Sequence, residues 1–363
     1  MGELIKKWED EQHEKWAKQY GFHPIQLMSA RELQEMDIPP LKWRVERILP
    51  VGVCGFAAKS KSFKSFACLD LCISVATGSE FLGFRTQQCD CVYMDLESGK
   101  RRPRDRINAI LQGQQAPENL FIMTLDDAVD KIGAGFEKQV SYILEEHPDV
   151  GLIVVDVFTK IRQQRGANRD AYSVDYSDIG VLTKIAHAND ICIVFVTHFT
   201  KGCHDDVFDN MIGSAGTMGS LDTAWVIEKE KRSDMDATLH IQGRDVEPQE
   251  IAISFNTDYM KWENVGTPEE IEYRERVKAY MNENIFRAIK QAVHECGSGY
   301  EASASEIRQY GLLHNLPIWQ EPQKIGNIIN DSADLLESDG ITFELKRTSK
   351  GRKYIFSCHQ CHS

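Results

Sequence analysis

Residues 51–71, VGVCGFAAKSKSFKSFACLDL, pass from an apolar run through a short segment rich in lysine and serine into a second apolar segment. The first run has the length of a buried strand, and Leu69, Ile73 and Ala76 recur on one face of a helix that would begin near Lys64. A phosphate-binding loop needs this setting, because backbone N–H groups and a helix N-terminus hold phosphates, lysine adds charge, and Ser or Thr binds Mg²⁺. The stretch therefore predicts a site for a nucleoside triphosphate.

Two registers of the pattern GxxxxGK[ST] compete in this loop. The register that ends in Lys61-Ser62 keeps Gly55, but it would end the strand by residue 54 and place Lys64 where its charge opposes the helix dipole. The register that ends in Lys64-Ser65 allows a full strand, although it loses both glycines of the pattern. We prefer the second register, and its nucleotide-binding residues are Ala58, Lys59, Ser60, Lys61, Ser62, Phe63, Lys64, Ser65 and Phe66.

Apolar runs of strand length alternate with helix-length segments between residues 43 and 262. The clearest are residues 51–57, 91–96, 120–125, 152–157 and 191–197, and runs that are apolar on successive residues suit strands covered on both faces. Three later runs, residues 223–228, 238–242 and 251–256, predict an antiparallel extension at one edge. We expect an α/β fold, a mostly parallel twisted sheet with helices on both faces and ligands at the carboxyl ends of its strands.

The chain divides into an arm and two domains in this interpretation. Residues 1–40 form a polar helical arm that stops at Pro39-Pro40, and residues 41–265 form the α/β domain. Thr267 and Pro268 are a helix-start signal that opens the third part, residues 266–363. There, helices over about 268–295, from about 303, and over about 322–338 precede a hairpin over 341–356, which is the order of a winged helix.

Composition limits the class of protein. No segment approaches the roughly 20 apolar residues of a membrane helix, so we expect a cytoplasmic location. With 55 acidic against 42 basic residues the net charge is −13, which repels a phosphate backbone and confines any DNA contact to local basic groups.

Six of the ten cysteines lie in apolar runs, where we expect free thiols in the core: Cys54, Cys68, Cys72, Cys89, Cys91 and Cys192. The C-terminal CxxCH at residues 358–362 matches a haem-attachment spacing, but adventitious metal binding or a disordered end is the simpler interpretation.

The stretch at residues 60–78 resembles the RepA-like ATPases of plasmids and phages, which are related to hexameric replicative helicases and belong to the RecA-like class. The resemblance covers about residues 30–264, and family members with Phe before the Lys-Ser pair favour the second register. It implies a RecA-like phosphate-loop core, ATP and Mg²⁺ as cofactors, a homo-oligomer of hexameric type, and single-stranded DNA as a partner.

Polar residues at or just beyond the ends of four predicted strands complete the site. A carboxylate after a strand can polarise the attacking water, and by resemblance Glu97 is the catalytic base. Asp156 ends an apolar run, where an unpaired charge is costly, so we place it beside the Mg²⁺ that Ser65 binds. The resemblance makes His198 a sensor of the γ-phosphate and Arg244 an arginine finger that reaches a neighbouring subunit's nucleotide, which demands a ring or filament.

Basic residues in loops and in the hairpin are candidates for DNA contact. By resemblance the loops after the Asp156 and His198 strands face a central channel with single-stranded DNA, and a basic hairpin tip suits the phosphates of duplex DNA. The candidates are Arg162, Arg165, Arg169, Lys201, Lys346, Arg347, Lys350, Arg352 and Lys353.

Three functions remain open at this point. The first is a DNA-translocating motor, a RepA-like replicative helicase. The second is an ATP-switched DNA-binding loader or recombination mediator, and the third is a regulatory ATPase that does not act on DNA.

Overall fold

The computed structural model describes residues 15, 17–19, 21, 25, 27–163, 171–199, 206–211, 218–231, 233–296, 299–348 and 351–358. The chain forms two compact units, Met1–Lys42 and Trp43–Ser363. In the first unit, helix α2 (Ala30–Glu35) begins with a capping box between Ser29 and Glu32 and buries none of its residues.

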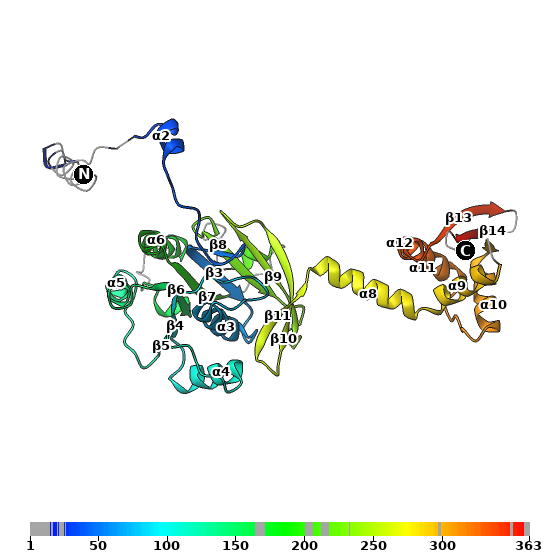
Figure 1. Cartoon of the computed structure of the whole chain (residues 1–363), viewed down its shortest axis with the longest axis horizontal. Helices are drawn as coiled ribbons and strands as arrows, with labels where there is room; N and C mark the ends of the chain where they lie inside the picture. The colour runs from blue at the N-terminus through cyan, green and yellow to red at the C-terminus, as the bar shows by residue number, and fades with distance from the viewer. Residues whose placement is uncertain are drawn as a thin grey trace. The chain divides into compact units, whose positions relative to one another are not determined.

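A nine-stranded sheet forms the centre of the described part of the second unit (Figure 1). Its strand order is β11-β10-β9-β8-β3-β7-β6-β4-β5. Six strands from β8 to β5 are parallel, and β9, β10 and β11 continue the sheet antiparallel at one edge. The mostly parallel sheet is therefore confirmed, and so is an antiparallel extension at one edge. The predicted membership of that extension was wrong at both ends, because the run 223–228 forms β8, which pairs parallel with β3, and Lys261–Gly266 adds β11. The strands are β3 (Gly52–Ala58), β4 (Asp90–Asp95), β5 (Leu120–Thr124), β6 (Val150–Asp156), β7 (Cys192–His198), β8 (Thr223–Glu228), β9 (Asp236–Gly243), β10 (Gln249–Asn256) and β11 (Lys261–Gly266).

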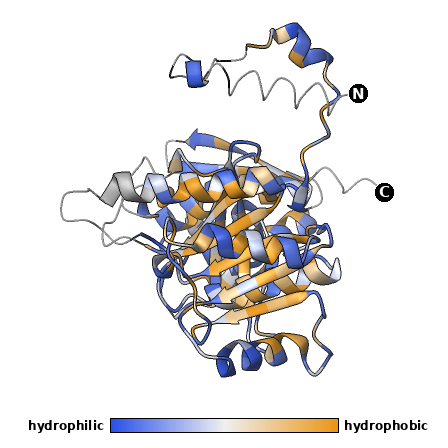
Figure 2. Ribbon diagram, turned by 90° about the vertical axis from the view of Figure 1, so that its left-hand side faces the viewer, coloured by the Kyte–Doolittle hydropathy of each residue, from blue (hydrophilic) through white to orange (hydrophobic). Residues whose placement is uncertain are grey.

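Helices cover both faces of this sheet, as the apolar strands predicted. Helices α3 (Lys64–Thr77) and α4 (Arg101–Leu111) pack into one buried cluster, and α5 (Phe136–Glu146) and α6 (Ala171–Asn189) pack into the other. The strands are predominantly hydrophobic along their length (Figure 2), because they are buried from both sides. The remaining short elements are strands β1 (Trp43–Val45) and β2 (Leu49–Pro50) and the 3₁₀ turns Phe158–Lys160 and Val207–Asn210.

The six cysteines predicted as core thiols are free, five of them buried and Cys89 half-buried. No described helix combines the length and the apolar composition that a membrane crossing needs.

The C-terminal elements have a hydrophobic cluster of their own. One helix was expected over about 268–295, but the helix ends at Asn282 because Glu283 takes an extended conformation, and a second begins at once. The helix expected over 322–338 is likewise divided at Ser332. The elements are α8 (Pro268–Asn282), α9 (Asn284–Cys296), β12 (Tyr300–Ala302), α10 (Ala304–Leu313), α11 (Pro322–Asp331), α12 (Ala333–Ser338), β13 (Ile341–Thr348) and β14 (Gly351–Cys358).

Strand register brings polar strand ends together at one edge of the sheet. Ala58 at the end of β3 is level with His198 at the end of the neighbouring β7, and Asp156 at the end of β6 is level with Asp95 at the end of the neighbouring β4. These residues are the last of their parallel strands, so they share the carboxyl edge, where ligands of open α/β sheets bind.

Candidate nucleotide-binding site

The loop between β3 and α3 presents an uncapped helix N-terminus. Helix α3 begins at Lys64, and no side chain caps it. In the loop, Lys59, Ser60 and Lys61 are exposed, whereas Ser62 is buried and its hydroxyl donates to the Lys59 carbonyl over 2.6 Å. The backbone N–H groups of a first helical turn have no partner within the helix, so this end of α3 suits an anion.

The side chain of Lys64 folds back beneath the loop. Its Nζ donates to the carbonyl of Ala58 over 2.7 Å and to that of Lys59 over 3.3 Å, and only 7% of the residue is exposed. Burial lowers the pKa of Lys64 to about 8, while the carboxylates of Asp156 and Glu97 act in the opposite direction. A buried ammonium with such surroundings gains from a phosphate oxygen placed above it.

Phe63 stands where the pattern has its second glycine, and it adopts the left-handed conformation with φ at 59°. This conformation costs a residue other than glycine about 1–2 kcal/mol. The Phe63 ring stacks on Phe255 with centroids 3.9 Å apart and lies edge-on to Trp262, and the Lys229 ammonium lies 4.8 Å from its centroid. Stacking adds about 0.5–1.5 kcal/mol beyond burial, so aromatic packing offsets the strain that glycine would avoid.

Phe255→Ala should therefore weaken both the fold and the loop. We expect a loss of about 3–5 kcal/mol in the free energy of unfolding, because Phe255 is 3% exposed, together with a raised KM for ATP. Phe136→Ala is the matched control, since Phe136 is equally buried on the other face of the sheet. Equal KM values for the two variants, measured by ATPase titration alongside urea unfolding, would contradict a role for the stack in holding the loop.

Asp156 is the last residue of β6 and is 8% exposed. Two hydroxyl groups contact its carboxylate. The Tyr93 hydroxyl donates to Asp156 Oδ2 over 2.8 Å, and the Ser65 hydroxyl is a second hydrogen-bond partner. Burial raises the pKa of Asp156, and the hydrogen bonds from Ser65 and Tyr93 act against this shift. The structure thus brings together Ser65 and Asp156, which were predicted as the Mg²⁺ residues.

Glu97 lies just beyond the end of β4, exposed, on a turn that Asp95 organises. Asp95 Oδ1 accepts from the backbone N–H of Ser98 over 3.1 Å and of Glu97 over 3.4 Å, and Arg106 Nη1 lies 3.5 Å from Asp95 Oδ2. The Ser98 hydroxyl also donates to this carboxylate. Glu97 influences the pKa values of both Lys64 and His198, so the three side chains share one electrostatic neighbourhood.

Tyr93 and Asp95 were missed in the sequence interpretation. Their signal was present, because a tyrosine and an aspartate interrupt the otherwise apolar run at residues 91–96. Nothing in the sequence showed that their partners would be Asp156 and the turn of Glu97.

His198 ends β7 beside Lys64. The distance from Lys64 Nζ to His198 Nδ1 is 3.2 Å, and burial together with the charge of Lys64 lowers the pKa of His198. An ammonium can only donate, so Nδ1 accepts and the ring proton of neutral His198 sits on Nε2. Nε2 is then the ring nitrogen that can donate to an oxygen at the site.

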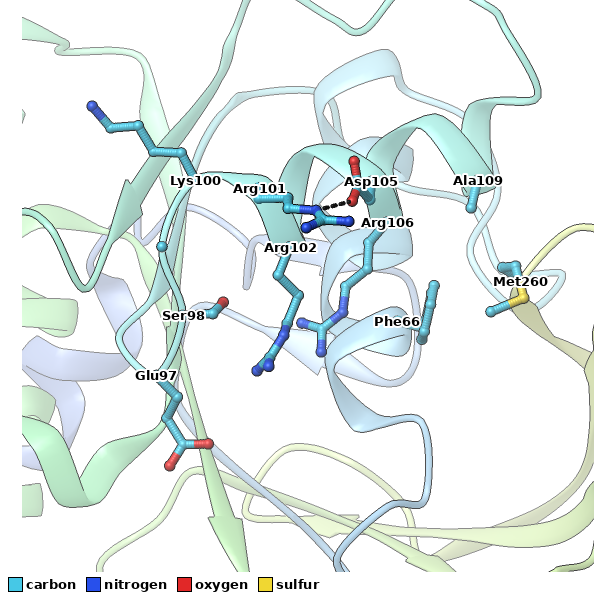
Figure 3. Close-up of a pocket in the computed structure, with 11 residues that line it drawn as sticks. Phe66, Glu97, Ser98, Lys100, Arg101, Arg102, Asp105, Arg106, Ala109 and Met260 are labelled. Carbon is cyan, nitrogen blue, oxygen red and sulfur yellow. Dashed lines mark ion pairs between the residues drawn. The ribbon is translucent and has the colours of Figure 1, made fainter.

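A pocket of about 850 Å³ adjoins this cluster on the side of α4. Arg102 and Arg106 extend from α4 toward the space between Glu97 and Phe66 (Figure 3), and the Arg106 guanidinium lies 5.5 Å from the Phe66 ring centroid. Met260 adds an apolar surface. The pocket therefore combines flat faces with positive charge, next to the carboxylate of Glu97.

The donor set fits Mg²⁺ of the kind that nucleotides bring. Among the described residues, no group of three or more His, Cys, Asp or Glu side chains could hold a metal alone. Mg²⁺ at phosphate sites takes one or two protein oxygens and completes its shell with phosphates and water. The hydroxyl of Ser65 and the carboxylate of Asp156 match that requirement.

Arg244 lies near the amino ends of the parallel strands, whereas Lys64 lies near their carboxyl ends. Gly243 pairs with Thr223, which pairs with Cys54 near the start of β3. Arg244 lies one residue further, where its N–H donates to Asp222 and the Asp222 N–H donates to Val53, so it is level with Val53. From Val53 to Ala58 the strand advances five residues, roughly 16 Å at about 3.3 Å per residue. Arg244 and Lys64 of one chain are thus on different edges of the sheet.

The structure describes five of the nine residues that were predicted to contact DNA. The Arg162 guanidinium lies 5.7 Å from the Phe158 ring centroid, and Lys346, Arg347, Arg352 and Lys353 lie on β13 and β14. Arg165, Arg169, Lys201 and Lys350 lie outside the described residues, as do residues 359–362 of the CxxCH segment.

The family model of the AAA domain matches residues 22–203, half of the chain. The chain belongs to the AAA domain family. This AAA domain protein is a phosphate-loop ATPase, and its core is the predicted mostly parallel α/β sheet. No curated protein sequence matches it significantly.

Three solved structures are similar to this AAA domain protein. The ATPase domain of G40P has 13% identity and a TM-score of 0.47, over 59% of this chain and 84% of that one. A DnaB-like replicative helicase, described with its interactions with primase, has 12% identity and a TM-score of 0.48, over 59% of this chain and 57% of that one. The KaiC-like protein PH0186 from Pyrococcus horikoshii OT3 has 11% identity and a TM-score of 0.42, over 61% and 93%.

Proposed function

We propose that this AAA domain protein is an ATP-driven DNA-translocating motor, a RepA-like replicative helicase that works as a ring with Mg-ATP bound between subunits. One observation carries the proposal. Lys64, Glu97, Asp156 and His198 converge at the carboxyl edge of the sheet, whereas Arg244 lies at the other edge. A complete set of hydrolytic groups then requires two subunits.

The β- and γ-phosphates of ATP bind over the N-terminus of α3. Lys64 turns its ammonium toward them, and the loop N–H groups complete the cradle. The nucleoside occupies the pocket beside α4, where the Phe66 ring and the Arg106 guanidinium provide faces for stacking. Mg²⁺, when bound, neutralises phosphate charge, and the Ser65 hydroxyl and the Asp156 carboxylate hold it.

Glu97 accepts the proton of the attacking water. Asp95 accepts a hydrogen bond from the Glu97 backbone N–H and so fixes the backbone of Glu97, while the Glu97 side chain remains exposed to solvent and to the attacking water. His198 donates its Nε2–H to an oxygen of the γ-phosphate and loses that partner when phosphate leaves. Because His198 ends β7 shortly before Lys201 in the sequence, the loss of this hydrogen bond reaches a segment proposed to contact single-stranded DNA.

The site cannot be completed by its own Arg244, and this favours a closed ring of about six subunits. In a head-to-tail assembly the amino edge of one sheet faces the carboxyl edge of the next, so that Arg244 meets the neighbour's γ-phosphate. A guanidinium there stabilises the charge of the transferring phosphoryl group.

The decisive experiment measures ATP hydrolysis with and without single-stranded DNA, followed by unwinding of a forked duplex. We expect DNA-stimulated hydrolysis and unwinding. Stimulation without unwinding would indicate a loader or mediator instead, and hydrolysis that ignores DNA would indicate a regulatory ATPase.

We further propose the three-part division at residues 1–40, 41–265 and 266–363, with a winged helix in the last part. The order α9, β12, α10, α11 with α12, β13 and β14, and the pairing of β12 with β14, support this assignment. The hairpin β13–β14 places Lys346 opposite Lys353 and Arg347 opposite Arg352. Like charges directly opposite each other destabilise a hairpin, so a polyanion is the partner that this wing fits.

The wing gives a prediction about salt. Alanine at Lys346, Arg347 or Arg352 should each reduce the slope of log affinity for duplex DNA against log salt by about one. Lys353→Ala is the matched control, because Glu301 and Glu306 already lie 3.5 and 4.0 Å from Lys353 Nζ, and it should change the slope less. Fluorescence anisotropy over a salt series measures the slopes, and four unchanged slopes would exclude the wing as a DNA contact.

A further inference from the structure

Asp222, which none of the assigned roles includes, is a buried carboxylate at the amino edge of the sheet. Its side chain is 8% exposed. Oδ2 accepts from the backbone N–H of Val53 over 2.8 Å and lies 3.0 Å from His187 Nε2, while Oδ1 faces Arg244 Nη1 at 3.6 Å. One carboxylate thus joins β3, α6 and the end of β9.

Two glycines make room for Asp222. A Cβ atom at Gly52 would come within 2.5 Å of Asp222 Oδ2, and one at Gly243 within 2.5 Å of the Asp222 carbonyl oxygen. A side chain at either position would push the Asp222 segment away from Val53 or Arg244. The sequence therefore allows the close packing of Asp222 against β3 and against the end of β9, because both of those segments have a glycine at the contact.

Arg244 is held from two sides by the same segment. Its backbone N–H donates to the Asp222 carbonyl over 2.9 Å, and its Nη2 donates to the Gly219 carbonyl over 2.8 Å. The Arg244 side chain is nonetheless 56% exposed. The guanidinium is thus engaged within the chain while more than half of the side chain remains exposed.

We infer that Asp222 is a positioning residue for Arg244: it orients the guanidinium in advance for the nucleotide of a neighbouring subunit. This inference rests on the proposed function, in which Arg244 acts on another subunit. An arginine that waits in its working orientation loses little side-chain freedom when the neighbour's phosphate arrives. The Val53 N–H and His187 contact Oδ2. Oδ1 of the negatively charged carboxylate therefore faces the Arg244 guanidinium and can orient it.

The test mixes subunits that are defective in different ways. Glu97→Gln subunits bind nucleotide and offer Arg244 but cannot activate water, and Arg244→Ala subunits keep Glu97 but lack the finger. Mixed oligomers of the two should regain ATPase activity. Asp222→Asn is then added to the Glu97→Gln subunits, where it keeps an oxygen for the Val53 N–H and removes the charge beside Arg244.

We expect Asp222→Asn in the Glu97→Gln subunits to lower the regained kcat about tenfold, with KM for ATP unchanged. The same substitution placed in the Arg244→Ala subunits should cost much less, because those subunits have no guanidinium to orient. Equal losses at both placements would show a purely structural role and overturn the inference, and so would full activity with Asp222→Asn. If the starting mixture regains no activity, Arg244 does not act between subunits, and the inference falls together with that part of the proposed function.

Discussion

Lys64→Ala should lower kcat for ATP hydrolysis about a hundredfold or more, whereas Lys61→Ala should leave most of the activity. The two lysines are three residues apart in the same loop, but their environments differ. Lys64 is buried beneath the loop, with its Nζ 3.2 Å from His198 Nδ1. Burial lowers the pKa of Lys64, and the charges of Asp156 and Glu97 act to raise it. Lys61 is exposed and has no such neighbours among the interactions of the described residues.

The pair also decides the register of the phosphate loop. Steady-state ATPase assays of both variants, with circular dichroism melts to show that each is folded, give the comparison directly. If Lys61→Ala abolishes turnover and Lys64→Ala does not, the phosphates bind at Lys61-Ser62 and not at Lys64-Ser65. The site proposed around Asp156 would then lack the lysine ammonium that binds the phosphates. Lys64→Arg adds a further test, because it keeps the charge but lacks the compact shape that fits beneath Ala58.

Glu97→Gln should lower kcat about 10²–10⁴-fold while ATP still binds. The amide keeps the size of the side chain and cannot accept the proton of the attacking water. Glu97 is exposed, and its turn depends on Asp95, so the substitution should not disturb the fold. Single-turnover hydrolysis and binding of a fluorescent ATP analogue separate the two effects.

Asp95→Asn is the informative companion to Glu97→Gln. It weakens the acceptor of the two backbone N–H groups that shape the turn and the ion pair with Arg106. We expect a smaller loss of kcat than for Glu97→Gln, together with a lower melting temperature. A Glu97→Gln variant with unimpaired hydrolysis would remove Glu97 from the role of base and leave Asp95 or Asp156 as the remaining carboxylates of the site.

The local features of this protein were readable from the sequence. The strand, loop and helix around residues 51–71, the runs of buried strands, the antiparallel extension and the free core thiols all follow from hydrophobic periodicity, which each segment carries by itself. For the same reason Glu97, Asp156 and His198 stood out as polar residues at the ends of apolar runs. In a parallel sheet such ends share one edge, which is why three separate segments could be assigned to one site.

Only the tertiary structure decided how these groups are supported. Phe63 keeps a left-handed conformation because Phe255, on a distant antiparallel strand, stacks beneath it. Val53 and Asp222 meet although 169 residues separate them. Contacts of this kind depend on strand order and register, and a sequence pattern records neither, because each partner looks ordinary within its own segment.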